Sequence, residues 1–444
     1  MKTLLIKPYS ANMDNELILP MTVYHIGSVL RDAGHEIAIV DQKIYAAGKM
    51  ECTYEEIVDD IIFNVDAVIY TVNTFDWCVA LDDIRRIRQN GYEGRVIVGG
   101  VHAALAYTHI VKNFSGIIDF VMVGDAETNL VPLLAHLEEE TDYSLVPGIA
   151  FLKDGKVKFN VCQIQKELAI TKNGPAYDLM PDGVYESITY ECSRGCFGRC
   201  SFCTIPFKRS WRPYDEEYIA HTLKNMIPHL DKLEGRRHII TTDDCFTTDP
   251  ERAVRLLKLF KEYGLQDCEI NLEARIMDLR NEELLSALKE FPNVHLQVGV
   301  EAGSDKGFKQ IHKPVTMEML HACSKRLAEV GLSKNVFYSF IVGLPQDTVE
   351  DCYTTLETSN DIFESYGIVS NIAFWIPLPS ESYELLKTMV PDMDYSIYDE
   401  LGWYGDKEFF RITHPKLTEM DIMEISQKVF EANSRQSLLK HDYL

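Results

Sequence analysis

Four cysteines lie close together in the stretch ECSRGCFGRCSFC, and this residue type points to metal binding. Their spacings of four, four and three also match one face of a helix, but the stretch contains glycines, which weaken a helix interior. A structural zinc site usually takes two separated pairs of ligands, and no distant CxxC or His pair completes one. An iron–sulfur cubane is the third interpretation, because three thiolates on one loop can hold three corners and leave the fourth iron open. The cysteines are Cys192, Cys196, Cys200 and Cys203.

Only three of these cysteines share a register that fits one cluster. Cys196, Cys200 and Cys203 form the pattern CxxxCxxC, whereas Cys192 comes directly after a β-branched run. We expect Cys192 to pack as a small apolar side chain. The alternative is that its thiol reaches the cluster or the substrate.

The composition is that of an ordinary globular protein, with 444 residues, 46% apolar and 25% charged. A chain of this length has room for two or three domains. The formal net charge of −24 argues against a nucleic-acid partner, because binding a phosphate backbone relies on clustered Lys and Arg. The odd number of cysteines does not suggest a disulfide framework. We find neither a signal-peptide pattern nor a membrane-spanning segment, and expect a cytoplasmic protein.

The first 150 residues repeat a short β-branched run followed by a helix-period segment. This pattern predicts an α/β module with a doubly wound parallel sheet, whose strands lie at 3–7, 36–41, 67–72, 95–100 and 120–125. Such sheets bind ligands at the carboxyl ends of their strands. Glycines at these ends either turn the chain or let the backbone approach a ligand. The candidate ligand-binding residues are Thr71, Asn73, Gly99, Gly100, His102, Gly124 and Glu127.

The second half of the chain predicts a partial barrel. Residues 151–185 are rich in turn signals, and we expect the domain linker there. Strand and helix patterns then alternate six times, which predicts a partial (β/α)6 barrel over 186–385 with its site at the carboxyl ends of the strands. Residues 386–444 are expected to form a small helical segment that closes the barrel. The predicted strands are 186–192, 238–244, 269–275, 294–301, 335–343 and 369–377.

The segment CFGRCSFC resembles the CxxxCxΦC signature of the radical S-adenosylmethionine (SAM) superfamily, whose core is a partial (β/α)6 barrel. The resemblance implies that Cys196, Cys200 and Cys203 bind a [4Fe-4S] cluster. The open iron would bind the amino and carboxylate groups of SAM, and electron transfer from the cluster would cleave SAM to a 5′-deoxyadenosyl radical. A flavodoxin or ferredoxin is the implied electron donor.

Further segments resemble one branch of this superfamily, the radical SAM enzymes that contain a cobalamin-binding domain. In the barrel these segments are TTDDCFTTD, NLEAR, VGVEAGSDKGFKQIHK and SFIVGLPQDTVED. Without the resemblance, the paired aspartates are interpreted as a helix cap and the glutamate of VGVE as a strand-end carboxylate. The implied SAM contacts are Asp243 and Asp244 with the methionyl amine, Glu301 and Ser304 with the ribose, Ile341 and Gly343 with the adenine, together with Phe202 and Arg275.

The N-terminal module resembles the cobalamin domain of the same branch. Residues 16–41 resemble its opening, GGVHAA its GGPHA turn, and IDFVMVGDAET its D-x-V-x-GEGE segment. Val101 replaces the proline of that turn. No DxHxxG motif follows the second strand, so the resemblance implies cobalamin bound base-off, without a histidine ligand. The seven residues at the strand ends then become candidate cobalamin contacts.

The resemblance implies methyl transfer to an unactivated carbon or phosphorus of a small-molecule or peptide substrate, in a site between the two modules. Radical ring formation or rearrangement with the same cofactors is the alternative. Methylthio transfer is disfavoured, because Cys52, Cys78 and Cys162 lack the pattern of a second three-cysteine cluster. A non-catalytic iron–sulfur or cobalamin sensor is disfavoured by the full set of segments that resemble SAM contacts.

Overall fold

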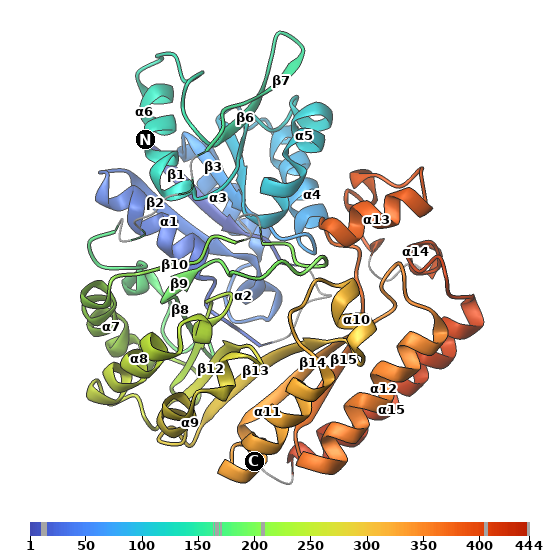
Figure 1. Cartoon of the computed structure of the whole chain (residues 1–444). Coiled ribbons are helices and arrows are strands. Elements are labelled where there is room, and N and C mark those ends of the chain that lie inside the picture. The colour runs from blue at the N-terminus through green and yellow to red at the C-terminus, as the bar shows by residue number, and fades with distance from the viewer. Residues whose placement is uncertain are drawn as a thin grey trace.

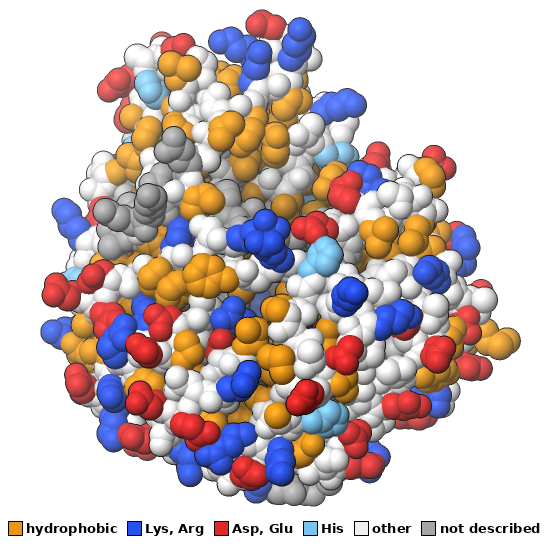
Figure 2. Space-filling view, in the orientation of Figure 1, with side chains coloured by type: hydrophobic (Ala, Val, Ile, Leu, Met, Phe, Trp, Pro, Cys, Tyr) orange, Lys and Arg blue, Asp and Glu red, His pale blue; other side chains and the backbone are white. Residues whose placement is uncertain are grey.

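The computed structural model describes residues 1–9, 16–162, 164, 168, 171–205, 209–403 and 407–441. Within these ranges the chain forms an N-terminal α/β module, a second α/β module and a helical C-terminal segment that contacts both (Figure 1). No helix in the described part of the chain combines the length and the apolar character needed to cross a membrane. Figure 2 shows acidic and basic side chains mixed over the face in view.

The N-terminal module contains a seven-stranded sheet in the order β2-β1-β3-β4-β5-β6-β7. Its first five strands pair in parallel and confirm the predicted doubly wound sheet. These strands are β1 (Lys2–Lys7), β2 (Glu36–Asp41), β3 (Ala67–Thr71), β4 (Arg95–Gly99) and β5 (Phe120–Met122). The connecting helices are α1 (Met21–Asp32), α2 (Gln42–Ala46), α3 (Tyr54–Ile61), α4 (Trp77–Gln89), α5 (Val101–Phe114) and α6 (Leu130–Glu138).

An antiparallel hairpin extends this sheet beyond the expected boundary at residue 150. β6 (Ile149–Lys153) pairs with β5, and β7 (Lys156–Phe159) pairs with β6. The turn between them is Asp154-Gly155, and both residues have positive φ, as a two-residue hairpin turn requires. The turn signal placed in the linker is therefore the turn of a hairpin. Part of the remaining linker, at 163, 165–167 and 169–170, lies outside the described residues.

The second module is a six-stranded parallel sheet in the order β15-β14-β13-β12-β11-β8, which confirms the predicted partial barrel. Each strand pairs with its neighbour in sequence, apart from a short two-stranded ribbon inserted after β8. The strands are β8 (Ile188–Tyr190), β11 (His238–Thr241), β12 (Glu269–Ala274), β13 (Val294–Glu301), β14 (Val336–Val342) and β15 (Val369–Phe374). The helices are α7 (Glu216–Leu230), α8 (Pro250–Glu262), α9 (Glu282–Leu288), α10 (Asp305–Gln310), α11 (Met317–Val330) and α12 (Val349–Tyr366).

The two edges of the barrel sheet are covered by other parts of the chain. Beside β8, Leu19 donates its backbone N–H to Ser187, and Glu186 donates to Leu17, so the segment before α1 continues the sheet. The C-terminal segment contains α13 (Glu381–Met389), α14 (Lys407–Thr413) and α15 (Glu419–His441), and α15 covers the other edge. The backbone N–H of Ile372 in β15 donates to Asn433 Oδ1 at 2.9 Å, and Asn433 Nδ2 donates to the Ile372 carbonyl at 2.8 Å. Side-chain amides of α15 thus bond the backbone of this edge strand as a further strand would, since Gln436 likewise accepts the backbone N–H of Ser370.

Replacing Asn433 by leucine is expected to destabilise the protein, because it leaves both backbone groups of Ile372 without their partner. The free energy of unfolding should fall by about 1–3 kcal/mol for each unsatisfied group, measured by urea denaturation. Gln427→Leu on the same helix is the control, since Gln427 is exposed and bonds only to Glu431 in the described contacts. Equal stabilities of the two variants would contradict this role of Asn433.

Candidate functional site

A cavity of about 660 Å³ lies between the two modules. Its wall combines the strand ends of β1, β3, β4 and β5 with residues that follow β8 and β11 of the barrel. This is the place at which parallel sheets bind ligands. The cavity wall includes seven of the residues predicted from the sequence: Thr71, Asn73, Gly99, Gly100, Gly124, Glu127 and Asp244.

The cysteine loop projects from a short ribbon of two antiparallel strands. β9 (Ser193–Arg194) leads into the loop and β10 (Arg212–Pro213) leads out of it. The two arms remain close beyond the ribbon, since Arg209 donates its backbone N–H to the Cys196 carbonyl at 3.0 Å. Gly195 has φ +80°, and a Cβ placed on it would lie 1.9 Å from the Ser210 carbonyl oxygen. Only glycine therefore allows the arms to run this close together.

The three candidate ligands, Cys196, Cys200 and Cys203, are half-buried on this loop. The backbone N–H of Gly198 donates to Cys196 Sγ at 3.3 Å. No three His, Cys, Asp or Glu side chains in the described ranges converge tightly enough to hold a single metal ion. Thiolate donors with a backbone N–H directed at sulfur fit the surroundings of an iron–sulfur cluster.

Cys192 is separate from these three. It is fully buried, and burial raises the pKa of its thiol. Its backbone N–H donates to Asp243, and its carbonyl accepts from Arg252 at 2.9 Å. A buried neutral thiol packs as a small apolar group, which agrees with the role expected for Cys192.

The paired aspartates after β11 hold the base of the cysteine loop. Asp243 accepts the backbone N–H of Cys192 at 2.8 Å and the hydroxyl of Ser193, so both of its oxygens are bonded within the protein. Asp244 accepts the backbone N–H of Gly195 at 2.7 Å and also lines the cavity. The alternative of a helix cap does not hold, because the residue that caps α8 is Asp249.

The other predicted SAM contacts lie outside the cavity wall. Most have a partner within the protein: Arg275 forms two bonds of 2.8 Å to Asp278, Glu301 pairs with Lys313 at 3.4 Å, and Ser304 caps α10. Phe202 and Ile341 are partly buried against the core, and a Cβ on Gly343 would lie 2.7 Å from the His414 ring.

A carboxylate that the sequence reasoning missed stands beside this group. Glu273, in β12, has its pKa raised to about 7 by burial and by the nearby charges of Glu301 and Asp244. In the sequence, Glu273 lies in the NLEAR segment, but the resemblance there implies a role for Arg275 and not for Glu273. The interior of the barrel thus contains a carboxyl group that is partly protonated at neutral pH.

His102 differs from the other candidates of the N-terminal module, because its side chain does not reach the cavity wall. It is fully buried, with Nδ1 3.2 Å from Thr74 Oγ1 and its ring stacked on Trp77 at 5.2 Å between centroids. Tyr398 of the C-terminal segment packs edge-on against it. Burial lowers the pKa of His102 to about 3, so the ring is neutral at neutral pH.

Acid should therefore destabilise the protein through His102. In the unfolded chain the imidazole of His102 binds a proton below about pH 6.5, whereas in the folded protein it does so only near pH 3. The free energy of unfolding therefore falls as the pH is lowered across this window. His102→Phe should remove up to about 1.4 kcal/mol per pH unit of this dependence, measured by denaturation at a series of pH values. The exposed His221→Phe is the control and should retain the wild-type slope.

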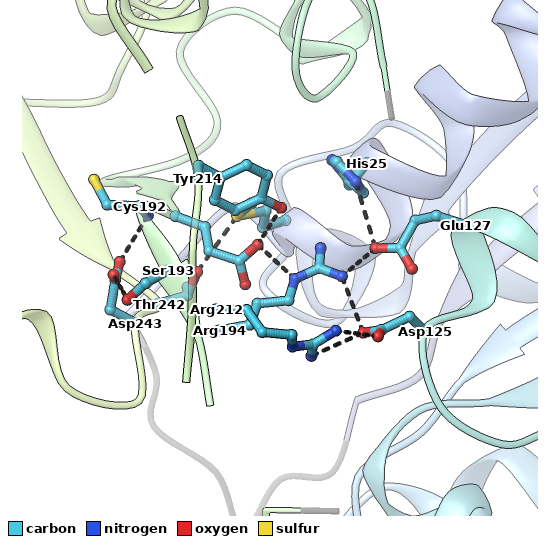
Figure 3. A network of polar contacts seen from close by, with 12 residues as sticks. His25, Asp125, Glu127, Cys192, Ser193, Arg194, Arg212, Tyr214, Thr242 and Asp243 are labelled. Atoms are coloured by element: carbon cyan, nitrogen blue, oxygen red, sulfur yellow. Dashed lines mark hydrogen bonds and ion pairs between the residues drawn. The ribbon is translucent and has the colours of Figure 1, made fainter. Parts of the chain in front are cut away.

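An ion-pair network missed by the sequence reasoning joins the two modules at the cavity (Figure 3). Arg194 Nη1 lies 2.5 Å from Glu127 Oε1 and 3.3 Å from Asp125 Oδ1, while its Nε donates to Glu191 at 2.7 Å. Arg212 forms a second ion pair with Asp125. The sequence named Glu127 as a candidate ligand contact, but it gave no signal that Glu127 or Asp125 pairs with an arginine of the other module.

The charges of this network determine its protonation. Burial raises the pKa of Glu127, but Arg194 and His25 outweigh it and bring the pKa to about 2. Burial lowers the pKa of His25 to about 4, and its Nε2 lies 3.4 Å from Glu127 without forming a hydrogen bond. Burial raises the pKa of Glu191, which also accepts from the Tyr214 hydroxyl at 2.7 Å. Glu127 is thus ionised and His25 neutral at neutral pH.

Comparison with known proteins adds to this geometry. Residues 190–358 match the family model of the radical SAM superfamily. An uncharacterized methyltransferase of Pyrococcus horikoshii is 26% identical over 391 residues, which cover 83% of this chain and 79% of the relative.

Two solved structures have a similar fold. One is the cobalamin-dependent SAM radical enzyme OxsB with aqua-cobalamin and SAM bound, at a TM-score of 0.68 and 19% identity. The match covers 94% of this chain, which spans 57% of the length of OxsB. The other is the radical SAM methyltransferase TsrM from Kitasatospora setae, at a TM-score of 0.68 and 15% identity, covering 87% of this chain and 76% of TsrM. At these identities the likeness shows a shared fold that extends over both modules.

Proposed function

We propose that this radical SAM enzyme is a cobalamin-dependent methyltransferase that acts on an unactivated carbon or phosphorus centre. The observation that carries the proposal is the cavity between the modules, because the strand ends of both sheets contribute to one wall. The N-terminal strand ends and Gly195, Thr204 and Ile205, which flank the three cysteines, thus line one cavity. The methyltransferase name of the Pyrococcus relative also supports it.

The residues present fit the implied cofactors. The three half-buried cysteines would hold the [4Fe-4S] cluster, and Asp244 is the predicted SAM contact that lines the cavity. Cobalamin would bind over the N-terminal strand ends, where Leu5, Ile69 and Met122 contribute apolar side chains to the wall. When bound, these groups supply a radical for hydrogen abstraction and a transferable methyl group.

The chain's own residues position the reaction. Asp243 and Asp244 fix the base of the cysteine loop, which lies beside the cavity. We expect cobalamin to be bound base-off, since no DxHxxG motif follows β2. We further propose a small-molecule or peptide substrate and a flavodoxin or ferredoxin as electron donor.

Anaerobic reconstitution with iron, sulfide and hydroxocobalamin tests the proposal. The reconstituted protein should contain bound cobalt and, with SAM and a reductant, should release both 5′-deoxyadenosine and S-adenosylhomocysteine. Cobalt-free protein after reconstitution would rule out the methyltransferase. 5′-Deoxyadenosine without S-adenosylhomocysteine would indicate ring formation or rearrangement instead, and neither product would indicate a sensor.

A further inference from the structure

The ribbon at the base of the cysteine loop also holds the N-terminal module. Arg194 and Arg212 are paired residues of β9 and β10, directly opposite each other. Both guanidinium groups point across the module boundary toward the segment that follows β5 (Figure 3). There they meet Asp125 and Glu127.

These ion pairs lie away from solvent. The side chains of Asp125, Glu127 and Arg212 are each less than a tenth exposed, and that of Arg194 is 17% exposed. A buried charge that loses its partner is strongly unfavourable. The carboxylates on one module therefore require the arginines on the other to remain where they are.

Each end of the network belongs to a different candidate cofactor site. Arg194 precedes Cys196 by two positions and lies in the strand that leads into the loop that would hold the cluster. Asp125 and Glu127 follow Gly124 and line the cavity where cobalamin would bind. A change in the position of the loop would thus be transmitted to the cavity wall of the other module.

We propose that these ion pairs couple the two cofactor sites, so that the cluster and cobalamin each bind more tightly when the other is in place. This inference rests on the proposed function. Three thiolate bonds to a cluster fix the loop, the fixed loop aligns both arginines, and the aligned arginines hold the cobalamin segment. Linkage requires the effect to be reciprocal. Arg194 and Arg212 are positioning residues in this scheme.

The wild-type protein provides the first test. Hydroxocobalamin is titrated anaerobically into cluster-loaded protein and into protein stripped of iron by a chelator, and binding is followed by visible absorbance. The cluster-loaded form should bind about tenfold more tightly, within the usual 5- to 150-fold range of such couplings. Equal affinities would overturn the coupling and leave the proposed function intact, whereas no binding to either form would overturn both.

Variants test whether the ion pairs carry the coupling. Arg212→Gln removes a partner of Asp125 and should bring the affinity ratio close to one, while Arg212→Lys, which retains the charge, should keep part of it. Lys49→Gln is the matched control, because Lys49 forms an exposed ion pair with Glu234 between the same two modules, and it should keep the wild-type ratio. A wild-type ratio in Arg212→Gln would overturn the role of the network.

The reciprocal measurement starts from the other module. Asp125→Asn should speed the release of cluster iron to a chelator. In the described contacts, Asp125 reaches the base of the cysteine loop only through its ion pairs with Arg194 and Arg212. Added hydroxocobalamin should slow iron release from the wild type and have little effect on this variant. Equal protection of both proteins by hydroxocobalamin would contradict the coupling.

Discussion

Replacing Cys200 by alanine is expected to abolish both the cluster and the cleavage of SAM. Two thiolates cannot hold a cubane that needs three, so iron and sulfide contents should fall sharply and the visible charge-transfer absorbance should disappear. 5′-Deoxyadenosine should drop to the background of the protein-free assay. Cys200 is only half-buried on its loop, so the rest of the fold should survive this change.

Cys192→Ala is the matched control for this experiment, because it makes the same change four positions before Cys196. The buried thiol of Cys192 packs in the core, and its loss should reduce stability modestly while leaving the cluster in place. SAM cleavage by Cys200→Ala, or loss of the cluster in Cys192→Ala alone, would contradict the division of the four cysteines into three ligands and one packing residue.

Replacing Gly195 by alanine is expected to prevent assembly of the cluster by moving the loop. The new Cβ would lie 1.9 Å from the Ser210 carbonyl oxygen, and the obstacle is backbone rather than a flexible side chain. The positive φ adds a cost of about 1–2 kcal/mol for any residue with a Cβ. The two arms must therefore separate, and the iron content after reconstitution should fall severalfold or more.

Gly183→Ala separates these two effects. Gly183 has a similar positive φ, but no atom lies within 4 Å of the place that the alanine methyl group would occupy. This control should lose about 1–2 kcal/mol of stability and retain its cluster. If both alanine variants assembled the cluster equally well, the close approach of the two arms at Gly195 would not matter for the site.

The sequence by itself predicted the parallel strands of the two sheets and the candidate metal-binding loop. Strand and helix periodicity are local properties of the backbone, so β-branched runs such as 67–72 and 238–244 predicted their strands. The register of Cys196, Cys200 and Cys203 is likewise local. The carboxyl ends of parallel strands then place the candidate residues at one edge of each sheet.

Only the tertiary structure decided how individual side chains are used. Asp243 could cap a helix or hold the loop, and its contact with the loop depends on β8 and β11 lying side by side. His102 faces Trp77 and Tyr398 because the C-terminal segment packs there. Segments far apart in the chain make these contacts, and no local pattern encodes them.

The junction between the modules shows the same limit most clearly. Arg194 and Glu127 carry no shared motif, and their pairing exists only because the cysteine loop of one module lies against the strand end of the other. Because both side chains lie mostly away from water, either charge left without its partner would strongly destabilise the protein. The sequence predicted a chemistry for each module, and the packing of one module on the other created the cavity and the ion pairs that join them.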